Sequence, residues 1–128
     1  MQNYREYQLC KAIAFYLKMQ YPKVIFHWDL EGSNLSIAQA GKMKSLQGDR
    51  GFPDLVIYEK RGGFGALALE IKAEGVKLYK RNGEPTTDHI REQRDCLLQL
   101  HLRGYQTGFA IGFDNARQVI DEYMRGLK

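Results

Sequence analysis

The sequence predicts an α/β fold in which helices flank a mixed central β-sheet. Segments whose apolar residues recur at helical spacing alternate with short segments rich in β-branched and aromatic residues. Glycine, proline and asparagine separate these segments, and no internal repeat or low-complexity tract interrupts them. The chain has 128 residues, which fits a single domain over residues 1–128.

Composition and charge are those of an ordinary globular protein. Hydrophobic residues make up 44% of the chain and charged residues 27%. No apolar run approaches the length that crosses a bilayer, and the N-terminus lacks the apolar region of a signal peptide, so we expect a cytoplasmic protein. Cys10 and Cys96 lie in helical segments with no partner at metal-ligand spacing, which predicts two buried thiols rather than a zinc site.

The first half of the chain contains one clear helix. Residues 3–20 carry apolar residues at helical spacing and are followed by Pro22, which ends the helix. Residues 24–28 are β-branched and aromatic and predict a strand. Residues 29–51 are the least regular segment: a short helix over 36–46 competes with glycines that favour a long loop, and such loops are usually functional or disordered.

The second half begins with a predicted β-hairpin. Residues 54–58 and 66–72 form its strands, joined through Gly62-Gly63. A second loop, residues 73–85, carries Gly75 and Asn82-Gly83.

A helix, a strand and a final helix complete the predicted fold. The helix is capped by Thr87 or Asp88 and runs to about residue 103, before Gly104. A strand over 105–112 follows, and Asp114 or Asn115 caps a last helix to about residue 125. The predicted order is α-β-β-β-α-β-α.

The strand over 66–72 presents two different faces. One carries leucine and isoleucine and is typical of a core; the other carries Ala66 and Ala68, followed by Glu70 and Lys72. Asp54 opens the preceding strand directly after Pro53. If Asp54 and Glu70 converge, two carboxylates share one space and repel unless a proton or cation lies between them, and Mg²⁺ suits such oxygen ligands.

Lys72 lies on the Glu70 face and has three candidate roles: holding a phosphate, stabilising a pentacovalent transition state, or helping to activate water. Together with a cation these parts make a phosphodiester hydrolase. The alternative interpretation is that Asp54 is a turn residue and that Glu70 and Lys72 form an exposed ion pair.

The hairpin geometry tests these interpretations. A plain two-residue turn at Gly62-Gly63 pairs Asp54 with Ile71 and places it on the leucine face. A shared cation therefore requires an odd-length loop or a β-bulge, because a one-residue shift moves Asp54 to the Glu70 face.

Two polar residues fall on otherwise apolar helix stripes. Gln93 lies on the stripe of the helix that follows Asp88, and Glu6 lies on that of the first helix. A polar residue on an apolar face costs stability unless it has a partner. The functional interpretation directs both at the metal site; the alternative is fraying or exposure near the helix starts.

Two glycine-containing segments concentrate positive charge, within a net charge of +4. Loops of this kind can contact phosphates without disturbing a core. The candidate nucleic-acid-binding residues are Lys42, Lys44, Arg50, Lys77, Lys80 and Arg81.

Pro53-Asp54, the hairpin, Glu70-Ile71-Lys72 and a helix bearing Gln93 resemble the PD-(D/E)xK nuclease superfamily. The pattern is similar over nearly the whole chain to its VRR-NUC branch, in the standalone form of phages and bacteria, with Gly51-Phe52-Pro53-Asp54 as its Gly-x-Pro-Asp motif. The resemblance implies a restriction-endonuclease-like fold. It also implies that Asp54, Glu70 and the Ile71 carbonyl bind metal, that Lys72 is catalytic, and that Glu6 and Gln93 support the site.

The resemblance implies a Mg²⁺-dependent DNA endonuclease, with Mn²⁺ able to substitute. Standalone members are similar to Holliday-junction resolvases, so branched DNA is the expected substrate. A restriction-type or single-strand nuclease is a second hypothesis, although no recognition insertion is present. A catalytically dead DNA-binding or assembly protein is a third, and the intact Asp54, Glu70 and Lys72 argue against it.

Leucines on the helix after Asp88 predict self-association. These leucines spread around the helix over a wider arc than a single core-facing stripe covers. They are Leu97, Leu98, Leu100 and Leu102. We expect a homodimer about a two-fold axis, which also suits two cuts in a four-way junction. The alternative is that these leucines pack beneath the loop over 29–51.

Overall fold

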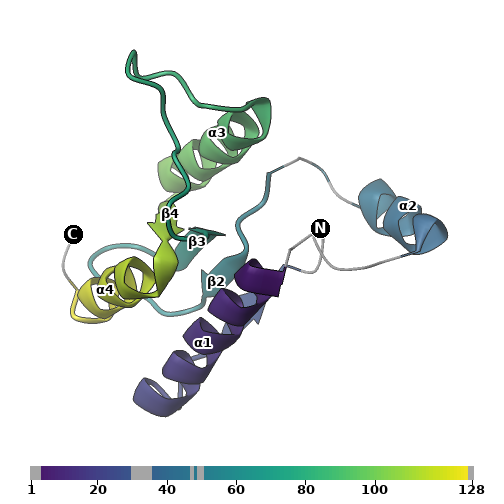
Figure 1. Ribbon diagram of the computed structural model, residues 1–128. Helices are drawn as coiled ribbons and strands as arrows, with labels where there is room; N and C mark the ends of the chain where they lie inside the picture. Colours follow the sequence, from purple (N-terminus) through teal and green to yellow (C-terminus); the bar gives the residue numbers. More distant parts are fainter. Residues whose placement is uncertain (1–3, 30–35, 47, 49–50, 127–128) are drawn as a thin grey trace.

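The computed structural model describes residues 4–29, 36–46, 48 and 51–126. Its elements, in chain order, are α1 (Tyr4–Gln20), β1 (Phe26–Trp28), α2 (Ile37–Leu46), β2 (Leu55–Ile57), β3 (Leu67–Lys72), α3 (Asp88–Leu102), β4 (Gln106–Ile111) and α4 (Gly112–Met124) (Figure 1). The predicted α/β class is confirmed. The short helix proposed for residues 36–46 is present as α2, so the order is α-β-α-β-β-α-β-α.

The sheet is mixed, as predicted, and its strands lie in the order β1-β2-β3-β4. The pairs β1–β2 and β2–β3 are antiparallel, whereas β3 and β4 are parallel and are connected through α3. Parallel neighbours need such a crossover connection, because a tight turn reverses the chain direction and can join only antiparallel strands.

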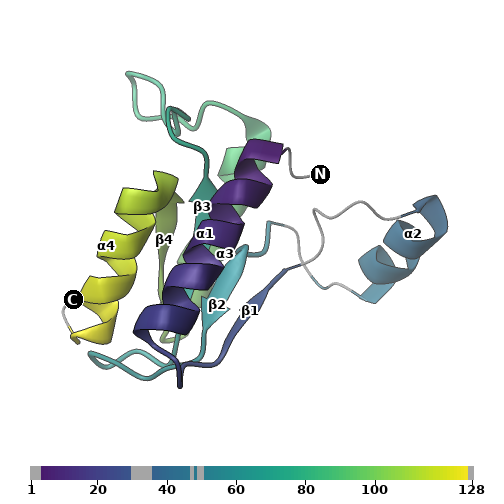
Figure 2. The ribbon, with the colours of Figure 1, turned by 60° about the horizontal axis from the view of Figure 1, so that its bottom comes forward.

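Helices cover both faces of the sheet. Figure 2 shows α1 and α4 together on one face and α3 on the other. The α1–α4 face holds the main core, with Leu67, Leu69 and Ile71 of β3 buried against the two helices. The other helix residues and strand residues of this cluster are Cys10, Ile13, Leu17, Leu55, Ile57, Ala110, Ala116, Ile120 and Tyr123.

The α3 face is also closed, which the sequence pattern does not show. Ile90, Gln93 and Leu97 are the buried residues of α3. The Thr107 hydroxyl in β4 donates to the Leu97 carbonyl at 3.1 Å and ties the helix to the sheet. Both faces of β3 are therefore covered, and Glu70 is not the exposed residue that the ion-pair interpretation requires.

The helix boundaries follow local chemistry, with one correction. Thr87 caps α3 by accepting a hydrogen bond from the Ile90 N–H at 3.1 Å, as one of the two predicted caps. The expectation that Asp114 or Asn115 caps the last helix is wrong, because α4 already begins at Gly112, whose φ is +80°. Asn115 instead acts from inside the helix, where its Oδ1 accepts the Ile111 N–H at 2.8 Å.

The β2–β3 hairpin contains the predicted one-residue shift. Arg61 pairs with Phe64 across the turn Gly62-Gly63, whereas Ile57 pairs with Leu67. The outgoing side thus carries Tyr58, Glu59 and Lys60, and the returning side only Gly65 and Ala66. The extra residue is a β-bulge, and it changes the face on which every earlier residue of β2 lies.

The bulge is held by the last helix. The Tyr123 hydroxyl donates to the Glu59 carbonyl, and the Arg61 Nε donates to the Met124 carbonyl at 3.1 Å. Tyr123 is 3% exposed, and its hydroxyl also lies 3.5 Å from the Phe64 carbonyl, so both acceptors within its reach belong to the hairpin. The register of the hairpin is therefore fixed from α4.

α2 lies apart from the sheet (Figures 1 and 2) and buries none of its side chains. Lys42 and Lys44 are exposed on it. None of the helices within the described ranges has the length and apolarity needed to cross a membrane.

Candidate active site

Three carboxylates fall on one row across the sheet. Continuing the β2–β3 pairing by one step beyond Leu55 and Leu69 places Asp54 opposite Glu70. Continuing the β1–β2 pairing beyond Trp28 and Leu55 places Asp29 opposite Asp54, and the Asp29 N–H donates to the Asp54 carbonyl at 2.8 Å. Residues opposite each other share a face, so these carboxylates lie on the α3 face.

Asp54 is also bonded directly to β3. Its Oδ2 accepts the Ile71 N–H at 2.8 Å, which fixes the carboxylate at the end of the strand that carries Glu70. Pro53 before it is buried. The bulge is what makes this position available, because the unshifted hairpin turns Asp54 to the leucine face.

Glu70 is the most deeply buried carboxylate of the row. Its side chain is 2% exposed. Burial raises the pKa of the Glu70 carboxyl to about 10, with hydrogen bonding to Asp54 and the Asp54 charge adding to the shift. Lys72 opposes the increase in pKa and Asp29 adds to it. At neutral pH the Asp54–Glu70 pair therefore retains a proton that a cation would displace.

Two buried polar atoms near this row have no hydrogen-bond partner among the described residues: Glu70 Oε2 and Gln93 Oε1. Gln93 is 4% exposed and comes from α3, which covers the Glu70 face. Leaving such an atom unsatisfied costs about 1–3 kcal/mol. A cation, a donor group or a water molecule between the two facing elements would satisfy both atoms.

His89 orients the amide of Gln93. Its Nε2 lies 3.2 Å from the Gln93 Nε2, one helical turn earlier on α3. With the amide donating, His89 carries its proton on Nδ1 and the Gln93 Oε1 faces away from the imidazole. His89 is exposed, so it lies at the outer end of this pair.

Gly51 holds the Asp54 loop against α3. Its φ is +74°, and a Cβ at this position would lie 2.9 Å from the Glu92 carbonyl carbon and 3.0 Å from the Gln93 nitrogen. Those atoms are helix backbone and cannot move aside as a flexible side chain can. Close contact at Gly51 therefore places the loop that leads to Asp54 beside the helical turn that carries Gln93.

The donor set suits a hard divalent cation. Asp54 and Glu70 supply carboxylate oxygens at the end of β3. Across the described ranges, no group of three or more His, Cys, Asp and Glu side chains is placed to hold a metal ion. A cation here would depend on the Asp54–Glu70 pair, a carbonyl such as that of Ile71, and water, which is the arrangement that Mg²⁺ tolerates.

The predicted residues divide into two groups. Asp54, Glu70, Gln93 and the half-buried Lys72 come together at the ends of β2 and β3 and under α3. Glu6 is half-buried in the first turn of α1, and its supporting role stays a prediction, as does that of the Ile71 carbonyl.

The basic residues lie away from this centre. Lys77, Lys80 and Arg81 are exposed between β3 and α3, and Lys42 and Lys44 are exposed on α2. Arg50 lies outside the described residues.

Sequence reasoning missed Asp29 and the role of Gly51. Asp29 follows directly after a short aromatic strand. Pairing that strand with the one that Asp54 opens would have identified Asp29 as a neighbour of Asp54. The prediction from the sequence that both thiols are buried is wrong for Cys96. Cys10 is buried, whereas Cys96 is half-exposed, and neither forms a disulfide.

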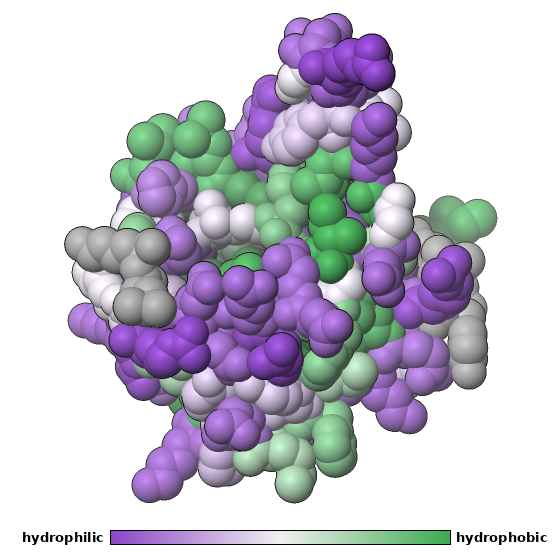
Figure 3. Space-filling model, turned by 60° about the vertical axis from the view of Figure 1, so that its left-hand side comes forward, coloured by the Kyte–Doolittle hydropathy of each residue, from purple (hydrophilic) through white to green (hydrophobic). Residues whose placement is uncertain are grey.

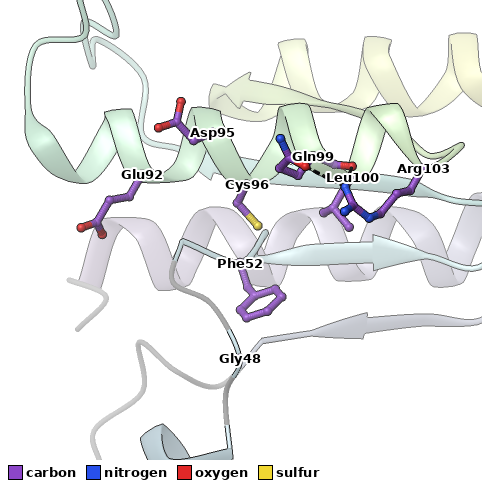
Figure 4. A pocket seen from close by; sticks show the side chains of 8 residues that line it. All are labelled: Gly48, Phe52, Glu92, Asp95, Cys96, Gln99, Leu100 and Arg103. Atoms are coloured by element: carbon purple, nitrogen blue, oxygen red, sulfur yellow. Dashed lines mark hydrogen bonds between the residues drawn. The ribbon is translucent and has the colours of Figure 1, made fainter.

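Cys96 borders a 570 Å³ hollow between α3 and the Phe52 segment (Figure 4). Glu92 and Asp95 lie toward one end of it, and at the other end Arg103 bonds the Gln99 side chain at 2.7 Å. Phe52 of the Gly-x-Pro-Asp segment closes the side opposite the helix. Phe52 and Leu100 also line a second, smaller hollow that Asp29 and Val56 border, so the two hollows are neighbours.

The fold and the row of carboxylates together define an α/β protein of restriction-endonuclease-like architecture. One solved structure, described as a "VRR_NUC domain protein", superposes on this chain with a TM-score of 0.69 at 23% sequence identity, over 100% of this chain and 94% of that one. No family model matches the chain, and no curated protein matches it. The structural likeness establishes that this chain has a VRR_NUC-type fold.

Proposed function

We propose that this protein is a metal-dependent DNA endonuclease that hydrolyses phosphodiester bonds at the Asp54–Glu70 centre. The observation that carries the proposal is the buried Glu70 carboxylate, whose Oε2 has no described partner and which lies directly across from Asp54. The VRR_NUC-type fold supports the same class of activity. Asp54 and Glu70 would hold Mg²⁺, with Mn²⁺ able to replace it, and the Ile71 carbonyl would complete the protein ligands.

When bound, the metal supplies Lewis acidity and lowers the pKa of water. The chain's own residues do the rest. Lys72 ends β3 on the Glu70 face, where its ammonium neutralises charge that develops on the phosphate oxygens. Gln93 presents its unpaired Oε1 from α3, suited to orienting a water molecule, and His89 holds that amide in place. Glu6 is proposed as a further support from α1.

Site variants test this assignment. Asp54→Ala, Glu70→Ala and Lys72→Ala should each reduce cleavage of DNA by at least a hundredfold, because each removes a group that acts in the chemical step. DNA binding and the circular-dichroism spectrum should stay close to those of the wild type. Near-normal, metal-dependent cleavage by any of the three would contradict the proposal; binding without any cleavage by the wild type would favour a dead DNA-binding protein.

We further propose branched DNA as substrate and a homodimer as the active form. Leu98 and Leu102 of α3 are 52% and 68% exposed, so the surplus leucines are not absorbed by the described residues of one subunit. Two copies would supply the two cuts that a four-way junction needs. Light scattering in moderate salt tests the dimer, and a strictly monomeric mass with junction cleavage retained rejects it. Cleavage assays on linear, single-stranded, flapped and four-way DNA test the substrate, and equal cleavage of all of them rejects the preference for branched DNA.

A further inference from the structure

The segment between β3 and α3 projects beyond the rest of the protein (Figures 1 and 2). Its residues 77–86 form a two-stranded ribbon. The Lys80 N–H donates to the Glu84 carbonyl at 2.7 Å, the Thr86 N–H donates to the Leu78 carbonyl at 2.9 Å, and Tyr79 pairs with Pro85. Backbone hydrogen bonds thus hold the projection in one conformation without help from the sheet.

The tip and base of this ribbon are also fixed. At the tip, Asn82 Oδ1 accepts the Glu84 N–H at 3.0 Å, and Gly83, with φ +89°, donates to the Lys80 carbonyl at 2.9 Å. At the base Pro85 is buried. Arg91 of α3 forms an exposed ion pair with Glu84 at 3.0 Å, a further contact between the ribbon and the helix.

The charge left exposed on the ribbon is positive. Lys77, Lys80 and Arg81 are exposed, and in the part of the chain that is described none of them is in an ion pair. Glu84, the acid of the ribbon, is engaged by Arg91. Figure 3 shows the projection at the top, coloured mainly as hydrophilic surface. A fixed, outward ribbon with cations at its tip matches a polyanion with a groove.

We propose that this ribbon seats in the major groove of a DNA duplex beside the phosphate that is cleaved, an inference that rests on the proposed nuclease function. A two-stranded ribbon fits the B-form major groove, which is about 12 Å wide and about 8.5 Å deep. From Lys77 to Arg81 the ribbon extends ~13 Å at the usual rise of a strand, enough to reach the groove floor. The segment that carries the ribbon begins after Lys72 and ends at Thr87, the cap of the helix that carries Gln93. A duplex that holds the ribbon in its groove is therefore positioned relative to the cleavage centre.

The occupant is B-form DNA rather than duplex RNA. The major groove of A-form RNA is deep and narrow and excludes protein elements of this width. A ribbon that reaches into the groove therefore discriminates the two duplexes, whereas lysines that contact phosphates from outside do not.

Salt-dependent binding tests the proposal. The variant Lys80→Gln/Arg81→Gln is compared with the wild type and with Lys18→Gln/Lys23→Gln. The control removes the same charge from exposed positions in the last turn of α1 and just after it, and this end of α1 lies opposite the ribbon in Figure 2. Affinity for one sequence as duplex DNA, duplex RNA and single-stranded DNA is measured by fluorescence anisotropy at several salt concentrations, with EDTA to prevent cleavage. Thermal melts confirm that all three proteins are folded.

The ribbon variant should lower the slope of log affinity against log salt by about 1.8 on duplex DNA, since each lost phosphate contact contributes about 0.9. At about 0.1 M salt this is a loss of affinity on the order of tens-fold. On duplex RNA and single strands it should behave like the control. An unchanged slope on DNA, or an equal loss on duplex RNA, overturns the groove assignment. A wild type that neither binds nor cleaves DNA refutes the proposed function itself, whereas normal cleavage with an inert ribbon refutes the ribbon alone.

Discussion

Replacing Glu70 by glutamine should stabilise the metal-free protein, although the residue is part of the proposed centre. Burial among acids raises the pKa of the Glu70 carboxyl from 4.5 to about 10, so the folded protein retains a proton that the unfolded chain releases. For an acid whose pKa is raised, the stabilisation is complete below the unfolded pKa and is lost as pH rises toward the folded pKa. The wild type should therefore become progressively less stable above pH 4.5.

The magnitude follows from the same shift. Each pH unit above the unfolded pKa costs about 1.4 kcal/mol, so the penalty at pH 7 is about 3 kcal/mol. Glutamine has similar size, keeps hydrogen-bonding groups toward Asp54 and carries no titrating proton. Glu70→Gln should therefore gain roughly this amount at pH 7 and nothing near pH 4.5.

Urea unfolding followed by circular dichroism, in EDTA and from pH 5 to pH 8, measures the difference directly. Adding Mg²⁺ should then stabilise the wild type and leave Glu70→Gln nearly unchanged, because binding to the folded state alone raises its stability. Asp88→Asn, an exposed acid at the start of α3, is the matched control. A stability difference that is the same at pH 5 and pH 8 would refute the reasoning.

Two further substitutions test how the centre is positioned. Gly51→Ala should destabilise the protein by about 1–3 kcal/mol and lower metal-dependent cleavage, because a Cβ at φ +74° meets the α3 backbone. The control Gly48→Ala, which has open space around it, should change neither stability nor cleavage in the same melts and assays. Tyr123→Phe should lower the free energy of unfolding by about 1–3 kcal/mol, because it leaves the Glu59 carbonyl unpaired, and it should broaden the amide NMR signals of residues 58–60. Sharp, unshifted signals there would show that the bulge does not depend on α4.

The face of Glu70 could be predicted from sequence, because alternation along a single strand assigns it without tertiary information. The shift that brings Asp54 to that face was also predictable, since two carboxylates can share a cation only from one side of the sheet. The structure confirms this shift in the pairing of Ile57 with Leu67.

Other features depend on partners distant in the chain. Asp29 joins the row only through the pairing of β1 with β2, which no local pattern specifies. The burial of Glu70 depends on α3 packing on its face, because the strand's own residues there are alanine and leave room for a helix. The start of the last helix was misplaced since Gly112, at φ +80°, turns the chain directly out of β4.

The bulge in the Ile57–Leu67 hairpin makes the strand register a determinant of chemistry. If the same chain paired without a bulge from the Arg61–Phe64 bridge inward, Asp54 would lie opposite Ile71, facing the leucines. Every residue of the centre would still be present in the sequence, yet its two carboxylates would lie on opposite sides of the sheet. A substitution that favours the unbulged pairing would therefore inactivate such a protein without touching a site residue.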